Sequence, residues 1–333
     1  MKAFILAAGF GTRLWPLTED RTKAAIPVLN RPLIDYSIEY LASHGFRDII
    51  VNLHHQPETI RRALGDGSRF GISLSYSFEK EILGTSGALD PLRDSLSGDD
   101  FVVMNGKIVT NIDLGAAVEA HREQNALATL VLKENPKREH FSIVEVDDRG
   151  WITRFAGFPE QAASQAATAT LPDARPVTKA ETVPLMFTGI QVLSPRIFEY
   201  IPRSRFSHST IDVYPRAIEE GEPIVGYISN EDWFEMSTLG RYLEANLRLM
   251  GKKGQSVIAG QDCIIEDGAT VEDSVLWDRV VVESGARVSH AVLADGVRIG
   301  AGQVIERSVV VRREMMSAIE RGEFFGDNLM VPI

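Results

Sequence analysis

The sequence contains almost no cysteine and no long apolar run. Cys263 is the one cysteine among its 333 residues, which excludes an intrachain disulfide and a zinc site built from cysteines. No stretch of roughly 18 consecutive apolar residues is present to predict a transmembrane helix. The apolar stretch at residues 2–9 is followed at once by Gly11 and Arg13, without a small-residue cleavage site. We therefore expect a cytoplasmic protein with no signal peptide and no membrane segment.

Net positive charge is also lacking. The chain has 35 Lys and Arg residues against 46 Asp and Glu residues, so its formal net charge is −11. Such a chain has no long-range attraction for nucleic acid or anionic lipid, and we expect neither as a partner. Any phosphate must be held by a local group of cations. The hydrophobic content of 44% is ordinary for a globular protein, and the length allows two modest domains of about 150 residues each.

The first half of the chain alternates short β-rich runs with amphipathic stretches, which is typical of an α/β domain. The predicted strands span residues 3–8, 48–53, 73–77, 101–105 and 128–133. Apolar residues recur every three or four positions in the predicted helices, which span residues 32–44, 57–64, 87–94 and 114–124. Residues 159–184 show neither period, which predicts a surface loop. Strand and helix patterns return at residues 186–246 and should complete the same domain.

A fixed repeat replaces this pattern after about residue 254. Three apolar positions recur every 17 residues, with steps of 6 and 5 inside each repeat. The nine positions are Ile265, Val271, Leu276, Val282, Val288, Leu293, Ile299, Ile305 and Val310. This repeat predicts a short hexapeptide-type β-helix of about three coils with one shortened side. A β-meander is the alternative, although a meander needs no fixed period.

A glycine-rich loop follows the first predicted strand, in the segment FILAAGFGTRLWPLT at residues 4–18. Gly9 and Gly11 lack side chains, so backbone N–H groups there can approach phosphate oxygens, and Arg13 adds a guanidinium. The same glycines also suit a simple strand-to-helix turn. The dinucleotide-binding fingerprint fails because its third glycine would fall at Leu14. Lys23 supplies a second cation shortly afterwards, which favours a phosphate site.

Residues 5–28 resemble the signature of the sugar-1-phosphate nucleotidyltransferases, also called sugar-nucleotide pyrophosphorylases. The similarity extends along nearly the whole chain and is greatest to mannose-1-phosphate guanylyltransferase-like members. It continues in VNLHH at 51–55, YSFE at 76–79, LGTSGAL at 83–89, Asn105-Gly106 and FTG at 187–189. The resemblance implies the fold class α/β: a Rossmann-like mixed-sheet nucleotidyltransferase domain at residues 1–250, a short left-handed β-helix at 255–312 and a C-terminal tail at 313–333.

The resemblance also implies an activity and a set of site residues. Such enzymes join a nucleoside triphosphate to a sugar 1-phosphate and release pyrophosphate. Arg13 and Lys23 would act on the reacting phosphates, and Gly189 would contact the sugar. The residues expected to bind the nucleotide are Leu6, Ala7, Ala8, Gly9, Gly11, Thr12, Arg13, Glu79, Gly84, Thr85 and Asn105. The expected partners are the two substrates and further copies of the chain in a homo-oligomer, or an active paralogue.

Glu79 bears on the choice of base, because the resemblance places it at the base edge. An ionised carboxylate only accepts hydrogen bonds. Guanine offers two adjacent donors, whereas uracil and thymine offer one N–H between two carbonyls, so we expect guanine. The alternative is a solvated carboxylate at the end of a strand.

Two positions depart from the pattern that the resemblance implies for the cofactor Mg²⁺. Lys107 stands where an aspartate is usual after Asn105-Gly106, and Glu235 replaces the second aspartate. Mg²⁺ prefers oxygen ligands, and an ammonium repels it. We therefore expect Glu235 as the remaining metal ligand, or an ion pair between Lys107 and Glu235 in place of the metal. In a further alternative, Lys107 is an exposed lysine and the substrate phosphates hold the ion with Glu235, Asp113 or Asp232.

These departures leave two functions open. Retained Arg13 and Lys23 favour an active nucleotidyltransferase with altered metal handling. The altered metal site favours a catalytically impaired relative that binds a nucleotide or a nucleotide sugar in a regulatory or assembly role.

Overall fold

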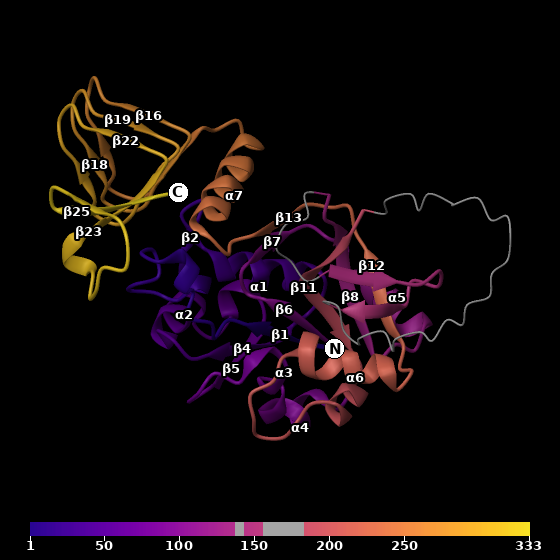
Figure 1. The fold of residues 1–333 in the computed structure, drawn as a ribbon. Helices are drawn as coiled ribbons and strands as arrows, with labels where there is room; N and C mark the ends of the chain where they lie inside the picture. The colour runs from indigo at the N-terminus through magenta and orange to yellow at the C-terminus, as the bar shows by residue number, and fades with distance from the viewer. Residues whose placement is uncertain (137–142, 156–182) are drawn as a thin grey trace, which may run out of the picture. The chain divides into compact units, whose positions relative to one another are not determined.

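The computed structural model describes residues 1–136, 143–155 and 183–333 (Figure 1). Almost all of the surface loop that we predict at residues 159–184 lies outside this described part. The chain divides into two compact units. The first unit consists of residues 1–4, 81–104 and 111–232, and the second consists of residues 5–80, 105–110 and 233–333. Within the described ranges, no helix combines the length and the apolar character needed to cross a bilayer.

The first unit is built on a mixed sheet. Strand β11 (Leu185–Leu193) is antiparallel to its neighbours β6, β8 and β9, while β12 runs parallel to β8. The other strands are β6 (Phe101–Asn105), β8 (Ala128–Glu134), β9 (Ile143–Val146), β10 (Ile152–Phe155) and β12 (Ile224–Ile228). The α-helices are α3 (Gly84–Gly87), α4 (Arg93–Leu96), α5 (Leu114–Glu123) and α6 (Tyr214–Glu219). Asp113 caps α5, because its carboxylate accepts a hydrogen bond from the Ala116 N–H at 3.1 Å.

The second unit begins with the end of β1 (Lys2–Leu6), a strand whose residues are divided between the two units. Its parallel strands β4 (Asp48–Leu53) and β5 (Ser73–Phe78) pair along their whole length. The next elements are β2 (Pro27–Val28), β3 (Arg31–Pro32), α1 (Leu33–Ser43), α2 (Pro57–Leu64), β7 (Ile108–Thr110), β13 (Trp233–Glu235) and α7 (Leu239–Gly251). Short 3-10 turns include η1 (Thr12–Leu14) and η2 (Lys23–Ala25).

The predicted strands and helices of the α/β region are confirmed with one correction. The helix predicted at residues 87–94 is wrong as a single element, because α3 ends at Gly87 and a 3-10 turn at Asp90–Leu92 precedes α4. Pro91 explains the interruption, since proline has no N–H and disfavours helical backbone at the residue before it.

The 17-residue repeat folds as the predicted left-handed β-helix, with its coils stacked in register. Each parallel pairing joins residues one repeat apart, as in Val271 with Val288 and Val288 with Ile305. The first face of the β-helix consists of β14 (Val257–Ala259), β17 (Ser274–Leu276), β20 (Val292–Leu293) and β23 (Ser308–Arg312). The second face consists of β15 (Ile264–Ile265), β18 (Val281–Val282) and β21 (Arg298–Ile299). The third face consists of β16 (Thr270–Glu272), β19 (Arg287–Ser289) and β22 (Val304–Glu306). Seven of the nine repeat positions are buried, whereas Val271 is half-buried and Ile265 is 44% exposed. Both lie in the first coil, which has a neighbouring coil on one side only.

The C-terminal residues fold back onto the last coil. The 3-10 turn η7 (Arg313–Met315) leads to the hairpin β24 (Glu323–Phe325) and β25 (Asn328–Pro332). Strand β25 pairs antiparallel with β23 and thereby extends one face of the β-helix. The tail that we propose at residues 313–333 is therefore structured and attached to the coils.

One hydrophobic core in the second unit joins the β-helix to the segment that follows the glycine loop. Leu14 and Trp15 from that segment, Tyr242 from α7, Trp277 from the β-helix and Leu329 from β25 all belong to it and are almost fully buried. Burial of apolar side chains is the main stabilising contribution in such a core. The position of the glycine loop consequently depends on the β-helix, although the two are far apart in the sequence.

Candidate functional site

The glycine loop (residues 7–18) makes the turn that its sequence predicts. Gly11 has a φ of 72°, and a Cβ there would lie 2.9 Å from Lys23 Cβ, so only glycine fits without strain. A Cβ on Gly9 would instead meet nothing within 4 Å. Among the described residues, no group accepts a hydrogen bond from the N–H of Gly9 or Gly11. The loop therefore presents backbone donors of the kind that bind phosphate oxygens.

Two further N–H groups of the loop are already bonded. Ala7 and Ala8 donate to Oδ1 of Asn52, at 2.5 and 3.2 Å, which is why β1 ends before them. Asn52 in turn donates from Nδ2 to Glu79 Oε1 at 2.6 Å. Both Asn52 and Glu79 are buried. Our sequence analysis missed Asn52, although an amide inside the apolar strand at residues 48–53 was a usable signal.

Lys23 lies in a group of charged side chains that we call the cation cluster: Arg13, Lys23 and Lys107, with Glu235. The pKa of Lys23 is lowered to about 7, mainly by burial and also by the nearby charges of Lys107 and Arg13, while the Glu235 charge opposes this shift. Each of these residues belongs to the second unit. The structure thus brings together Arg13 and Lys23, the two predicted catalytic residues, and adds a third cation at Lys107.

The pairing of β7 with β13 places Lys107 beside Glu235. Ile108 pairs with Glu235, and the Met236 N–H donates to the Lys107 carbonyl oxygen at 3.1 Å. The Lys107 ammonium forms an ion pair with Glu235 Oε1, which confirms the ion pair expected from the sequence. Burial alone would raise the pKa of Glu235, but the Lys107 charge holds it below its usual range. Lys107 is therefore half-buried in an ion pair and is not the exposed surface lysine of the alternative.

Arg241 adds a fourth cation that sequence analysis missed. It lies in the first turn of α7, where the Thr238 hydroxyl accepts a hydrogen bond from its N–H at 3.3 Å. Its Nη1 atom is 3.7 Å from Glu235 Oε2. A threonine before an amphipathic stretch signals a helix start, so the position of Arg241 at this helix end was predictable. Its contact with Glu235 was not.

The cation cluster does not fit Mg²⁺. The ion requires several hard oxygen ligands at 2.0–2.1 Å in an octahedron. Glu235 is the one carboxylate of the cluster, and its two oxygens face Lys107 and Arg241. Over the part of the chain that the structure describes, no three His, Cys, Asp or Glu side chains gather as a metal site would require. Asp113, a predicted alternative ligand, caps α5 instead.

Three predicted residues belong to the first unit. Gly84 has a φ of 81°, and a Cβ there would lie 2.4 Å from the Ser207 carbonyl oxygen, so the approach of the two segments requires glycine. The Thr85 hydroxyl accepts a hydrogen bond from the Ser209 N–H at 3.0 Å. Gly189 has a positive φ and lies where the pairing of β11 with β8 is interrupted. Our sequence analysis did not anticipate Ser207 and Ser209 as supports for this turn.

The remaining predicted residues lie in the second unit. Leu6 ends β1, and its carbonyl oxygen accepts a hydrogen bond from the Gly106 N–H at 3.0 Å. Asn105 precedes that glycine at the end of β6, and Thr12 opens η1. The proposed roles of all these residues in binding the nucleotide and the sugar stay predictions.

Comparison with known proteins identifies related sequences along most of the chain. Residues 2–251 match the family described as nucleotidyl transferase, and residues 241–328 match the GlmU-like C-terminal hexapeptide family. A UTP–glucose-1-phosphate uridylyltransferase of Synechocystis sp. is 32% identical over 270 residues, which cover 77% of this chain and 65% of the relative. A mannose-1-phosphate guanylyltransferase of Mycobacterium tuberculosis is 26% identical over 278 residues, which cover 82% of this chain and 72% of the relative.

The chain thus spans just under two thirds of the length of the Synechocystis relative. A solved structure shares the fold: a Bacillus anthracis protein assigned as a glucose-1-phosphate thymidylyltransferase and crystallised with sucrose. Its TM-score is 0.60 at 22% identity, over 74% of this chain and 94% of that one. The family match covers the glycine loop and the whole cation cluster. The chain therefore belongs to the nucleotidyl transferase family.

Proposed function

We propose that the chain is a sugar-1-phosphate nucleotidyltransferase. In this reaction an oxygen of the sugar phosphate attacks the α-phosphorus of a nucleoside triphosphate, a new P–O bond forms, and pyrophosphate leaves. The observation that carries the proposal is the convergence of Arg13, Lys23 and Lys107 beside the glycine loop. Phosphoryl transfer needs positioning and charge neutralisation from the protein and little covalent chemistry. Three cations and unbonded N–H groups supply both.

Each residue has a distinct part in this proposal. Gly9 and Gly11 let the backbone donate to phosphate oxygens, and the Arg13 guanidinium binds them as a rigid fork. Lys23, whose pKa is about 7, takes up a proton when the anionic phosphates arrive, because a nearby negative charge favours the ammonium form. Lys107 and its partner Glu235 fill the place that the resemblance gives to Mg²⁺. We propose that the cation cluster neutralises the phosphates without a metal ion held by Glu235.

We further propose GTP and a mannose 1-phosphate-like sugar as the substrates. The support for guanine is chemical, since the Glu79 carboxylate accepts hydrogen bonds and guanine presents two adjacent donors. The relatives named above differ in their bases, so the choice needs a direct test. The competing role for Glu79 is structural, through its hydrogen bond with Asn52. Glu79→Gln distinguishes the two: a narrowed preference for GTP over UTP supports base reading, and equal losses for both nucleotides support the structural role.

The second candidate is a catalytically impaired relative that binds the nucleotide for regulation or assembly. The ion pair between Lys107 and Glu235 favours it, because the pair occupies the implied metal site. Pyrophosphate release decides between the two functions. The protein is incubated with GTP, UTP or dTTP and several sugar 1-phosphates, with Mg²⁺ or with EDTA. Turnover supports the transferase, whereas tight GTP binding without turnover supports the impaired relative.

We also propose that the chain forms a homo-oligomer through its β-helix, alone or with an active paralogue, in the cytoplasm. Ile264 and Ile265 of the first coil and Val304 of the last are 55%, 44% and 51% exposed. Exposed apolar side chains at the end of a β-helix suit a contact between copies. Light scattering of the intact chain and of an Ile264→Lys, Ile265→Lys variant tests the oligomer. Equal monomeric masses for the two proteins would exclude this contact.

The proposed location in the cytoplasm rests on cysteine content. A chain with a single cysteine suits a reducing compartment.

A further inference from the structure

An exposed aromatic side chain lies in the glycine loop. Phe10 stands between Gly9 and Gly11, and the N–H groups of both glycines are unbonded within the described part of the chain. Phe10 is 50% exposed. A Cβ on Gly9 would meet nothing within 4 Å, so the space next to that residue is open. The phosphate donors of the loop therefore adjoin a large apolar surface that the protein leaves half uncovered.

Two histidine rings lie against Phe10. The centre of its ring is 5.3 Å from that of His54, with the planes at 85°, and 5.7 Å from that of His55, with the planes at 55°. Rings inclined in this way are not parallel, so neither histidine takes a stacked position on Phe10. We call these three residues the aromatic corner. A flat ligand can still stack on it.

The aromatic corner is joined to Glu79, the residue expected at the base edge. His54 Nδ1 lies 2.9 Å from the Glu79 carbonyl oxygen, and Nδ1 is the donor of this hydrogen bond because a carbonyl only accepts. The Glu79 carboxylate accepts a hydrogen bond from Asn52, which also binds the N–H groups of Ala7 and Ala8. One hydrogen-bonded group thus connects the ring surface, the carboxylate and the start of the glycine loop.

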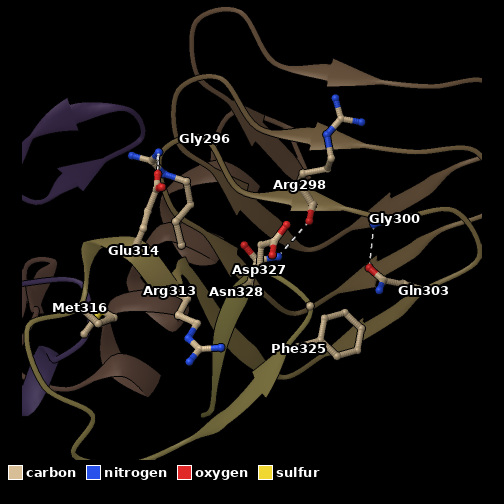
Figure 2. Close-up of a pocket in the computed structure, with 12 residues that line it drawn as sticks. Gly296, Arg298, Gly300, Gln303, Arg313, Glu314, Met316, Phe325, Asp327 and Asn328 are labelled. Atoms are coloured by element: carbon tan, nitrogen blue, oxygen red, sulfur yellow. Dashed lines mark hydrogen bonds and ion pairs between the residues drawn. The ribbon is translucent and has the colours of Figure 1, made fainter.

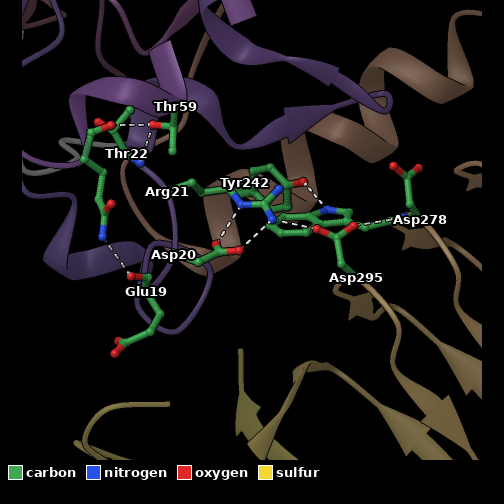
Figure 3. Close-up of polar contacts among 10 residues, drawn as sticks. Glu19, Asp20, Arg21, Thr22, Thr59, Tyr242, Asp278 and Asp295 are labelled. Carbon is green, nitrogen blue, oxygen red and sulfur yellow. Dashed lines mark hydrogen bonds and ion pairs between the residues drawn. The ribbon is translucent and has the colours of Figure 1, made fainter. Parts of the chain in front are cut away.

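The turn after His55 is fixed to the segment that follows the glycine loop. Gln56 has a φ of 47°, and its carbonyl oxygen accepts a hydrogen bond from the Thr59 hydroxyl at 2.7 Å. The Thr22 N–H donates to the same hydroxyl at 3.3 Å (Figure 3). The Gln56 side chain donates from Nε2 to the Glu19 carbonyl oxygen at 3.5 Å. These contacts hold the two histidines beside the glycine loop.

The same segment also contacts the β-helix. Figure 3 shows Arg21 between Asp20 and Asp295. The Asp295 carboxylate pairs with Arg21 Nη2 at 2.6 Å, and both side chains are less than 20% exposed. Beyond the last coil, the Ser317 N–H donates to Glu19 Oε1 at 3.0 Å. A loop whose flanking segment is already fixed loses less entropy when a ligand binds.

We propose that the aromatic corner stacks on the nucleobase of the substrate, an inference that rests on the proposed function. A nucleoside triphosphate carries a polyanion and a flat ring in one molecule, and the glycine loop presents phosphate donors and an aromatic face on adjacent residues. Every base can stack on an aromatic side chain, because each base has a π-face. Phe10 therefore supplies affinity for the base, while the Glu79 carboxylate selects among bases by their hydrogen-bonding edges.

Phe324 provides a matched control. It is a phenylalanine of β24 that is 49% exposed, close to the value for Phe10. The hairpin of β24 and β25 borders a pocket of about 710 Å³ beside the last coils of the β-helix (Figure 2). None of the residues that line this pocket belongs to the glycine loop or to the aromatic corner. Phe324→Leu therefore removes an equally exposed ring without changing the proposed site.

Calorimetry on the full chain with two probes tests the stacking. One probe is whichever of GTP, UTP and dTTP the wild-type chain binds most tightly, and the other is inorganic triphosphate, which has the phosphates but no base. We expect Phe10→Leu to weaken binding of the nucleotide about tenfold and to leave binding of inorganic triphosphate unchanged. Phe10→Tyr keeps a ring and should retain the affinity for the nucleotide. Phe324→Leu should change neither affinity.

Three results would overturn the stacking role. They are an unchanged affinity of Phe10→Leu for the nucleotide, equal losses of nucleotide and inorganic triphosphate in that variant, and equal losses of nucleotide affinity in Phe10→Leu and Phe10→Tyr. Equal losses of both probes would show that the substitution disturbs the loop as a whole. If the wild-type chain binds none of the three nucleotides, the proposed function itself is contradicted, together with the stacking role.

Discussion

Lys107 and Glu235 form an ion pair at the centre of the candidate site, held by the pairing of β7 with β13. Glu235 is 5% exposed, so its charge depends on its cationic partners. The pair joins two segments that are more than a hundred positions apart in the sequence. Both charges of the pair act on Lys23, since Lys107 lowers its pKa and Glu235 raises it.

Replacing the pair by two aspartates should create a metal site. Lys107→Asp with Glu235→Asp removes the ammonium and supplies two carboxylates, so we expect measurable Mn²⁺ or Mg²⁺ binding by calorimetry and faster pyrophosphate release. Either single change should do less, because Glu235→Asp alone keeps the Lys107 ammonium at the site and Lys107→Asp alone keeps the longer Glu235 side chain. If the wild-type chain turns over at an ordinary rate of about 1–10³ per second only when Mg²⁺ is present, the metal-free assignment is wrong.

Removing the Lys107 charge should destabilise the fold. Lys107→Met leaves the buried Glu235 carboxylate without its main partner, and we expect the free energy of unfolding to fall by about 1–3 kcal/mol at pH 7. Lys253→Met is the control, since Lys253 is exposed. Urea unfolding of both variants measures the difference. Equal unfolding free energies for the Lys107→Met and Lys253→Met variants would show that the Glu235 carboxyl is protonated or is paired with another group.

Triphosphate affinity should depend on pH through Lys23. Its pKa is about 7 in the free protein, so the ammonium form is lost as the pH rises through 7. We expect GTP affinity to fall between pH 6 and pH 8, with proton uptake on binding at pH 8. In the unfolded chain Lys23 titrates near 10.4, so the unfolded state binds more protons between these two values and Lys23 contributes a rise in stability with pH there. Lys23→Met should remove both the fall in GTP affinity between pH 6 and pH 8 and the contribution of Lys23 to the rise in stability with pH.

Gly9 and Gly11 should respond differently to alanine. Gly11→Ala forces a Cβ against Lys23 at a positive φ, and we expect a loss of about 1–2 kcal/mol in unfolding free energy. Gly9→Ala meets open space, so stability should hold while GTP binding weakens, because the new methyl group occupies the approach to the backbone. Thermal unfolding and calorimetry on the same two variants separate the effects. A stable Gly9→Ala variant with normal GTP affinity would argue against phosphate binding at this loop.

Arg13→Ala should weaken triphosphate binding by about 1.5–3 kcal/mol, the range for a charge-assisted hydrogen bond. Arg62→Ala is the matched control, because Arg62 is an exposed arginine of α2. Calorimetric titration with GTP measures both variants. Similar affinities would remove Arg13 from the site.

Local patterns in the sequence predicted most of the fold. The strand at residues 48–53, the helix at residues 57–64 and the coil spacing followed from periodicity, because each depends on neighbouring residues. The contacts of Asn52 and Arg241 could not be predicted in this way, since their partners come from distant segments. The prediction of the β-helix as a separate domain also did not include the hydrophobic core that it shares with Leu14 and Trp15. Long-range packing, which no local period encodes, decides these features.

The 17-residue register also sets a rule for how this part of the chain can change in length. Insertion of one complete coil keeps every strand pairing intact, whereas a single residue inserted within a strand turns the buried side chains that follow it in that strand outward. Yet one extra coil after Asp295 would displace Ser317 by about 4.8 Å, the spacing of paired strands, and separate it from Glu19. An extra coil before Asp295 would do the same to its contact with Arg21. The coil number is therefore constrained by the glycine loop, and the β-helix acts as a spacer of fixed length.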